Sequence, residues 1–131
     1  MHTEVMILAW GAVLLVIHIF AAAHVKTKQY GTDWNIGPRD EPMPPLNEYA
    51  GRLKRAQDNF METFPVAIVA LVGVVIAGRT SGTTVLGGWI WLVARVIYLP
   101  IYYAGIKGLR TGVFLVSLLG LGMVIWPLLI P

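Results

Sequence analysis

The sequence of 131 residues contains no cysteine, so it can form neither a disulfide nor a thiolate metal site. Any sulfur nucleophile must therefore arrive with a substrate. Charged residues are also scarce, at 13% of the chain, whereas ordinary soluble domains have about 25%. Hydrophobic residues reach 56%, and a chain this small could hardly bury them all in a core of its own. The composition excludes an ordinary soluble domain.

Four stretches of the chain are apolar over the length that a membrane-spanning helix needs, about 20 residues. They are residues 4–25, 46–78, 83–104 and 112–130. Backbone groups in lipid must be satisfied within their own segment, which favours helices. The sequence predicts an all-α membrane protein in which residues 1–131 form one domain, a four-helix bundle. A signal peptide is the alternative for the first stretch, but this stretch lacks a basic start and is longer than a typical apolar signal region.

The basic residues are distributed unevenly between the two sides of these spans. Most of them lie in loops 26–47 and 105–111 and at the start of the second span, and only Arg79 lies on the opposite side. By the positive-inside rule, both loops face the cytoplasm and both termini face away. We expect a multi-pass protein with no nucleic-acid partner. The glycines and prolines of residues 26–45 predict a connection without regular structure.

Ionisable and amide side chains form a stripe on the second span. Arg52, Arg55, Asn59 and Glu62 are three, four and three residues apart, so they share one face of a helix, and Glu48 extends this face by one turn. Pro65 removes a backbone hydrogen bond and is expected to bend the helix just beyond them.

The third span carries a second stripe, formed by Arg95, Tyr98 and Tyr102. Arg95 lies about 15 Å from the cytoplasmic end at the helical rise. An unpaired arginine at that depth costs roughly 2.5–3.5 kcal/mol. Glu62 is the carboxylate expected to pair with it, either as part of a site or simply to hold the two spans together. The two tyrosines are interpreted either as site residues or as interfacial aromatics, the usual interpretation also for Trp91.

The two stripes open toward the same side and are rich in arginine. Such a cleft suits a small anionic ligand, because guanidinium groups bind carboxylates through paired hydrogen bonds. Apolar walls would suit a lipophilic co-substrate from the membrane. The three histidines show no spacing typical of a metal site, so no metal is expected. His18, among apolar residues, is expected to form a hydrogen bond to another helix.

Two motifs resemble those of a known family, the membrane-associated proteins in eicosanoid and glutathione metabolism (MAPEG). The second span contains the pattern Arg55-Ala56-Gln57-x-Asn59-x-x-Glu62-x-Phe64-Pro65, and the third contains Arg95-x-x-Tyr98-x-x-x-Tyr102. The number of spans and the sides of the loops are also similar. The stretch Gly37-Pro38-Arg39-Asp40 resembles that of bacterial members, which implies a location in the inner membrane of a bacterium.

The resemblance implies a homotrimer that binds glutathione, as co-substrate, between neighbouring subunits on the cytoplasmic side. The residues that match the glutathione contacts of the family are Arg55, Asn59, Glu62, Tyr98, Tyr102 and Arg95, with Lys26 as the candidate on the first span. Arg110 matches the arginine that stabilises the glutathione thiolate and is the expected catalytic residue. The implied activity is that of a membrane-bound glutathione transferase or peroxidase acting on lipophilic small molecules.

Two alternatives stay beside this interpretation. Asp58 stands where some relatives have a second arginine, which leaves room for a non-catalytic MAPEG-like lipid-binding or scaffold protein. A small multidrug exporter also has four short spans, but it requires an acidic residue deep in the first span. In this chain Glu4 lies only at the edge of that span.

Overall fold

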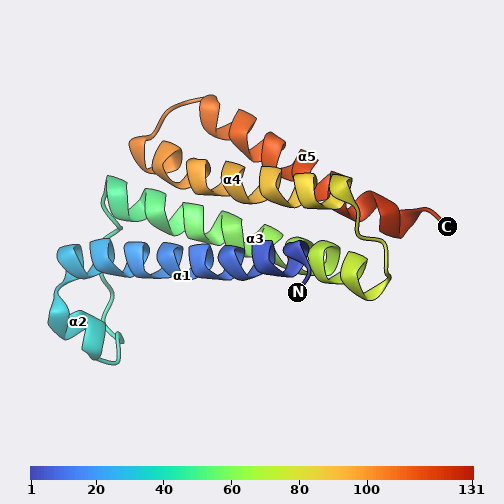
Figure 1. The fold of residues 1–131 in the computed structure, drawn as a ribbon. Helices are drawn as coiled ribbons and strands as arrows, with labels where there is room; N and C mark the ends of the chain where they lie inside the picture. The colour runs from blue at the N-terminus through green and yellow to red at the C-terminus, as the bar shows by residue number, and fades with distance from the viewer.

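The computed structural model describes residues 1–131 and contains helices but no strands (Figure 1). The helices are α1 (Thr3–Tyr30), α2 (Thr32–Ile36), α3 (Glu48–Ile76), α4 (Gly82–Ala104) and α5 (Leu109–Leu129). All except α2 are long and apolar enough to cross a membrane. The predicted all-α fold with four spans is confirmed, and the chain is an integral, multi-pass membrane protein.

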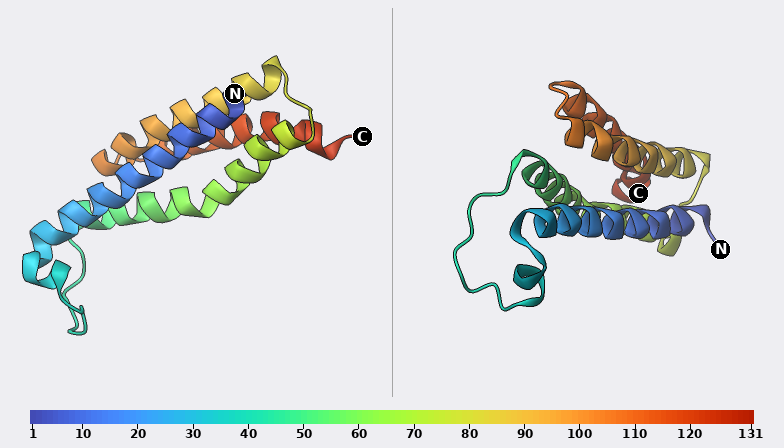
Figure 2. Two further views of the ribbon diagram at one scale, coloured as in Figure 1. Left: turned by 60° about the horizontal axis from the view of Figure 1, so that its bottom comes forward. Right: turned by 90° about the vertical axis from the view of Figure 1, so that its left-hand side faces the viewer.

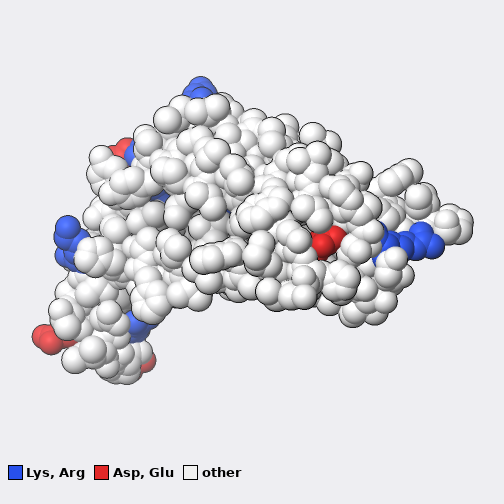
Figure 3. Space-filling view, in the orientation of Figure 1, with Lys and Arg blue, Asp and Glu red and all other residues white.

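The long helices run up and down, with α1 beside α3 and α4 beside α5 (Figures 1 and 2). Both termini lie at one end, with the α3–α4 turn, and the other two connections lie at the opposite end. Figure 2 shows α3 bending along its length, in agreement with the proline at Pro65 inside this helix. On the face drawn in Figure 3, charged side chains gather at the two ends and the stretch between them is nearly free of charge. This is the surface that a lipid bilayer requires.

The first connection is more ordered than its composition predicted. α1 continues through Lys26 to Tyr30, and the five-residue α2 follows, so the prediction of an irregular segment is wrong for these residues. The end of α1 also holds the returning chain. The Tyr30 hydroxyl donates to the carbonyl of Pro44 (2.5 Å), and the Gln29 amide donates to that of Pro45 (2.9 Å). These hydrogen bonds replace the regular structure that the prolines prevent.

The core lies between all four long helices and is built around stacked aromatic rings of α3 and α4. Phe60, Phe64 and Trp91 stack on one another, with ring centroids 5.3–6.2 Å apart. Trp91 is 1% exposed, so its interpretation as an interfacial anchor is wrong. His18 stacks on Phe60, but its Nδ1 bonds to the carbonyl of Leu14 in its own helix (2.9 Å). The predicted interhelical hydrogen bond of His18 is therefore also wrong.

Two glycines let α4 and α5 approach each other closely. A Cβ atom on Gly120 would lie 2.6 Å from the carbonyl oxygen of Gly87 and 2.6 Å from the amide nitrogen of Trp91. Only glycine fits such a contact between backbones. From this crossing the two helices diverge toward the turn that joins them (Figure 1).

Polar contacts secure the end that carries the termini. The buried Glu4 carboxylate accepts a hydrogen bond from the Thr84 hydroxyl (2.6 Å), which ties α1 to the start of α4. Arg79 donates to the carbonyls of Pro127 (2.7 Å) and Ile130, which lie at the end of α5. The single basic residue at this end thus supplies donors for carbonyls that a helix end leaves without partners.

Candidate anion-binding cleft

A hollow of about 260 Å³ opens at the basic end of the bundle, between α3, α4 and the α4–α5 turn. It is lined by Arg52, Arg55, Tyr102, Gly105, Ile106, Lys107 and Arg110. Four of these side chains are cationic and none is acidic. We call this hollow the basic cleft, and its charge favours an anionic ligand.

Tyr102 lines the basic cleft and contacts two of its arginines. The Nε of Arg55 donates to the Tyr102 hydroxyl (3.3 Å), and the Arg110 guanidinium lies 4.7 Å from the centre of the Tyr102 ring. Both contacts leave most guanidinium N–H groups available to a ligand. Since Arg55 comes from α3 and Arg110 from α5, the ring of Tyr102 on α4 joins all three helices at this site.

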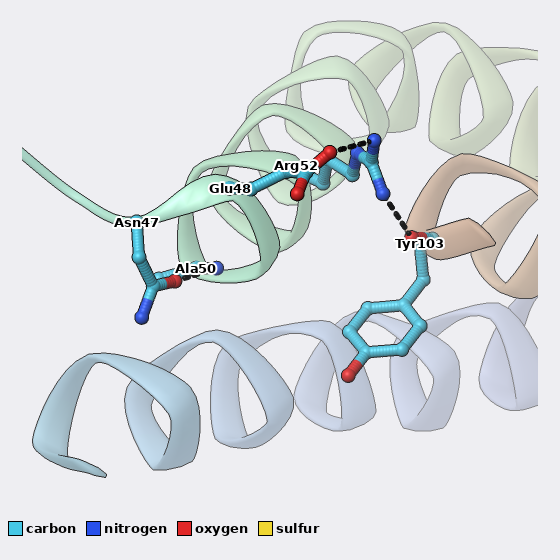
Figure 4. A network of polar contacts seen from close by, with 5 residues as sticks. All are labelled: Asn47, Glu48, Ala50, Arg52 and Tyr103. Carbon is cyan, nitrogen blue, oxygen red and sulfur yellow. Dashed lines mark hydrogen bonds and ion pairs between the residues drawn. The ribbon is translucent and has the colours of Figure 1, made fainter. Parts of the chain in front are cut away.

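Arg52 lines the cleft from the second turn of α3. Figure 4 shows its polar contacts. Its guanidinium donates to the Glu48 carboxylate (2.5 Å) and to the carbonyl of Tyr103 (3.1 Å). Asn47 caps α3 by accepting a hydrogen bond from the amide of Ala50 (2.9 Å), which fixes where this turn begins. These contacts tie the first turns of α3 to the end of α4.

Gly105 makes room for Arg52. A Cβ atom on Gly105 would lie 2.6 Å from the Arg52 guanidinium carbon, and its φ of 72° also favours glycine. The i,i+4 spacing of Glu48 and Arg52 signals their ion pair in the sequence. The position of Arg52 against the α4–α5 turn has no such signal.

A second layer of aromatic and cationic groups lies next to Tyr102, deeper in the bundle. The ring of Tyr98 meets that of Tyr102 edge-on, with centroids 5.5 Å apart. Arg95 is fully buried, and its guanidinium lies 4.3 Å from the Tyr98 ring centre and 4.9 Å from that of Phe60. Its Nη1 donates to the Asn59 side chain (2.7 Å), whereas Nε and Nη2 have no hydrogen-bond partner. Aromatic faces thus supply much of the stabilisation of this cation.

The predicted pair of Arg95 and Glu62 does not form within the protomer. Arg95 bonds to Asn59 instead, and Glu62 is exposed. The reason is geometric, because Phe60 points into the bundle and the residue two positions later points nearly the opposite way. Arg55 and Asn59 reach α4 from the face that they share with Glu62, whereas Glu62 lies at the outer edge of that face.

Lys26 and Asp58 also lie apart from the basic cleft. Lys26 lines a separate hollow of about 160 Å³, beside Trp34 and Gln57. Asp58 accepts a hydrogen bond from Lys54 (2.8 Å) on the exposed surface of α3. The acid at position 58 thus adds no negative charge to the lining of the basic cleft.

The structure therefore brings Arg55, Tyr102 and Arg110 together and places Tyr98, Arg95 and Asn59 in the adjoining layer. Glu62 and Lys26 stay apart from them in the protomer. The sequence interpretation placed Arg52 on the polar stripe of the second span but did not count Arg52 or Lys107 among the site residues; both line the cleft. No group of histidines and carboxylates in the structure could hold a metal ion.

Comparison with known proteins matches this chain to one family. The model of the MAPEG family matches residues 7–130, nearly the whole chain. No curated protein and no solved structure gives a match. The match includes every helix and every residue of the basic cleft.

Proposed function

The chain belongs to the MAPEG family, and from this membership and the basic cleft we propose a membrane-bound glutathione transferase or peroxidase. The family includes glutathione transferases and peroxidases as well as non-catalytic members. The observation that carries the proposal is the meeting of Arg55, Arg110 and the Tyr102 hydroxyl in one cationic hollow. Glutathione carries two anionic carboxylates and a thiol that becomes an anionic thiolate when it loses its proton, so a cationic hollow suits all three groups.

The size of the cleft supports a site completed by a second subunit. Ligand pockets usually measure about 300–1,000 Å³, and the cleft of one protomer is slightly smaller, at about 260 Å³. Glu62 is exposed on the outer edge of α3, and Lys26 lines a separate hollow on α1. In the proposed homotrimer, Lys26 of one subunit and the α3 edge of its neighbour bind the same glutathione molecule.

The proposed chemistry uses the thiol of glutathione and no nucleophile of the protein. Arg52, Arg55 and Lys107 bind the carboxylates, and the Arg110 guanidinium stabilises the thiolate because opposite charges favour ionisation. In the transferase reaction the sulfur bonds to an electrophilic carbon and the leaving group departs. In the peroxidase reaction the thiolate cleaves the O–O bond, and a second glutathione yields the disulfide, the alcohol and water.

The membrane supplies the second substrate in this proposal. The protein is embedded in lipid, where lipophilic electrophiles concentrate. The excess of lysine and arginine at the end with the basic cleft supports a cytoplasmic location for that end. We therefore place both termini on the opposite side of a bacterial inner membrane, with glutathione entering from the cytoplasm.

The test uses purified protein in lipid nanodiscs, with glutathione and chlorodinitrobenzene. We expect thiolate absorbance when glutathione is added and turnover above the uncatalysed rate. Arg110→Met should lower the rate by about 10²-fold or more, as removal of one charge-stabilising donor commonly does. Lys28→Met removes a charge at the same end of the molecule but outside the cleft, and should leave the rate unchanged.

The alternative is a non-catalytic member that binds lipid or acts as a scaffold. If glutathione gave no thiolate absorbance and no turnover with any electrophile, this alternative would replace the enzyme. The position of Asp58 favours the enzyme, because its ion pair with Lys54 lies outside the cleft.

A further inference from the structure

A second hollow, of about 660 Å³, lies between α4 and α5 on the flank of the bundle. It opens where these helices diverge from the crossing of Gly87 and Gly120 (Figure 1). Its lining is apolar and includes Trp89, Val93, Ala94 and Ile97 of α4 and Leu109 and Val113 of α5. We call it the α4–α5 groove. We propose that it binds the alkyl chain of the lipophilic co-substrate, an inference that rests on the proposed function.

Small residues keep the α4–α5 groove open. Gly112 belongs to its lining, and a Cβ atom on this residue would have no heavy atom within 4 Å. The walls are accessible from outside, since Val93 is 51% exposed and Val116 is 48% exposed. Both residues lie in membrane-spanning helices, so the groove is accessible from the lipid.

The groove ends beside the basic cleft. Leu109 lines the groove and Arg110, the next residue, lines the cleft, so the first turn of α5 stands between the two. Val113 lines the groove and also packs against the cluster that contains Tyr98 and Tyr102. A chain that lies in the groove therefore brings its polar end to the turn that carries Lys107 and Arg110.

These features select the chemical class of the co-substrate. The walls offer no hydrogen-bonding side chain except the indole of Trp89, so polar groups along the chain would find few partners. The polar and reactive group must be at one end, near the cations. Among compounds of this layout we choose the linear, long-chain α,β-unsaturated aldehydes, because their carbonyl oxygen takes up negative charge beside Arg110 during the addition.

The addition of glutathione to such an aldehyde is balanced without another reactant. The thiolate sulfur forms a bond to the β-carbon, and the electron pair of the double bond moves toward the carbonyl. Arg110, which stabilises the thiolate before the addition, then stabilises the negative charge that develops on the carbonyl oxygen. The α-carbon then takes a proton from water, and neither a leaving group nor an oxidant is involved.

The test fills the groove and compares two chain lengths. Gly112→Phe places a ring in the groove, and Gly122→Phe is a matched control on α5, since a Cβ atom there also meets nothing within 4 Å and this glycine does not line the groove. In nanodiscs, Gly112→Phe should lower kcat/KM for dodecenal relative to pentenal by roughly tenfold. Turnover of chlorodinitrobenzene should stay at the parent level in both variants.

A dodecyl ketone with a diazirine near the end of its tail tests binding without turnover. We expect photolabelling of residues 89–97 and 109–116, abolished by Gly112→Phe and retained by Gly122→Phe. Labelling elsewhere, or equal labelling of both variants, would overturn the groove proposal. If Gly112→Phe left the ratio of kcat/KM for dodecenal and pentenal unchanged, the groove proposal would also be overturned. Activity of the parent toward chlorodinitrobenzene would then still support the proposed function. If the parent conjugated no electrophile, the proposed function would fail, and labelling would still decide whether the groove binds an alkyl chain.

Discussion

The crossing of α4 and α5 allows a quantitative prediction for Gly120→Ala. The added Cβ atom would lie 2.6 Å from two backbone atoms, the carbonyl oxygen of Gly87 and the amide nitrogen of Trp91. No side-chain rotation relieves contacts with backbone, so the helices must move apart. Such overpacking typically costs about 1–3 kcal/mol.

The alanine also contributes a helix propensity gain of about 1 kcal/mol, which must be separated from the clash. Gly122→Ala on the same helix provides this control, because its Cβ atom meets nothing within 4 Å. The difference between the two variants should therefore be about 1–3 kcal/mol. For a chain of this size it corresponds to a Tm lower by about 4–12 °C.

The assay is the loss of helical circular dichroism in mixed micelles, as a function of temperature and of the fraction of denaturing detergent. Gly120→Ala should unfold before Gly122→Ala in both experiments. Equal unfolding of the two variants would refute the close approach of the α4 and α5 backbones. Without that close approach, the divergence that opens the α4–α5 groove would also lose its physical cause.

Three further predictions follow from individual contacts. Asn59→Ala removes the only hydrogen-bond acceptor of buried Arg95 and should destabilise the protein by about 1.5–3 kcal/mol in the same unfolding assay, whereas Asn59→Asp should recover much of the loss. Arg79→Met should cost about 1 kcal/mol of local stability and speed hydrogen exchange at residues 121–131, because the end of α5 loses its donor; exchange as slow as in the parent would contradict this role. Because the chain has no cysteine, single cysteines at Lys28 and Thr80 report orientation: a membrane-impermeant maleimide applied to intact cells should label the second and not the first, and the reverse pattern would invert the proposed topology.

The fold was largely predictable from the sequence because the lipid bilayer acts on each span separately. About 20 apolar residues suffice to predict a spanning helix, whatever its neighbours are. The exceptions arose where tertiary contacts decide. Trp91 is of a residue type common at membrane interfaces, but it is buried against Phe60 and Phe64. Helix α1 extends to Tyr30, whose hydroxyl donates a hydrogen bond to the returning chain.

The candidate site was predictable in part. Helical spacing correctly grouped Arg95, Tyr98 and Tyr102 on α4, because residues three and four apart share a face. Spacing could not show how α3 is rotated about its axis. That rotation directs Phe60 inward and Glu62 outward, and it leaves Asn59 as the partner of Arg95.

The sequence alone determined that the protein lies in a membrane and crosses it with four helices. It also determined the family motifs and the end of the molecule at which the positive charges gather. These properties depend only on composition and local periodicity. The tertiary structure decided which cations meet. Tyr102 joins Arg55 and Arg110, which are far apart in the chain, and Gly105 makes room for Arg52 beside them. It also decided where the bundle stays open, since the crossing at Gly87 and Gly120 sets the divergence of α4 and α5. Such contacts depend on the rotation and separation of packed helices, which no local pattern in the sequence specifies.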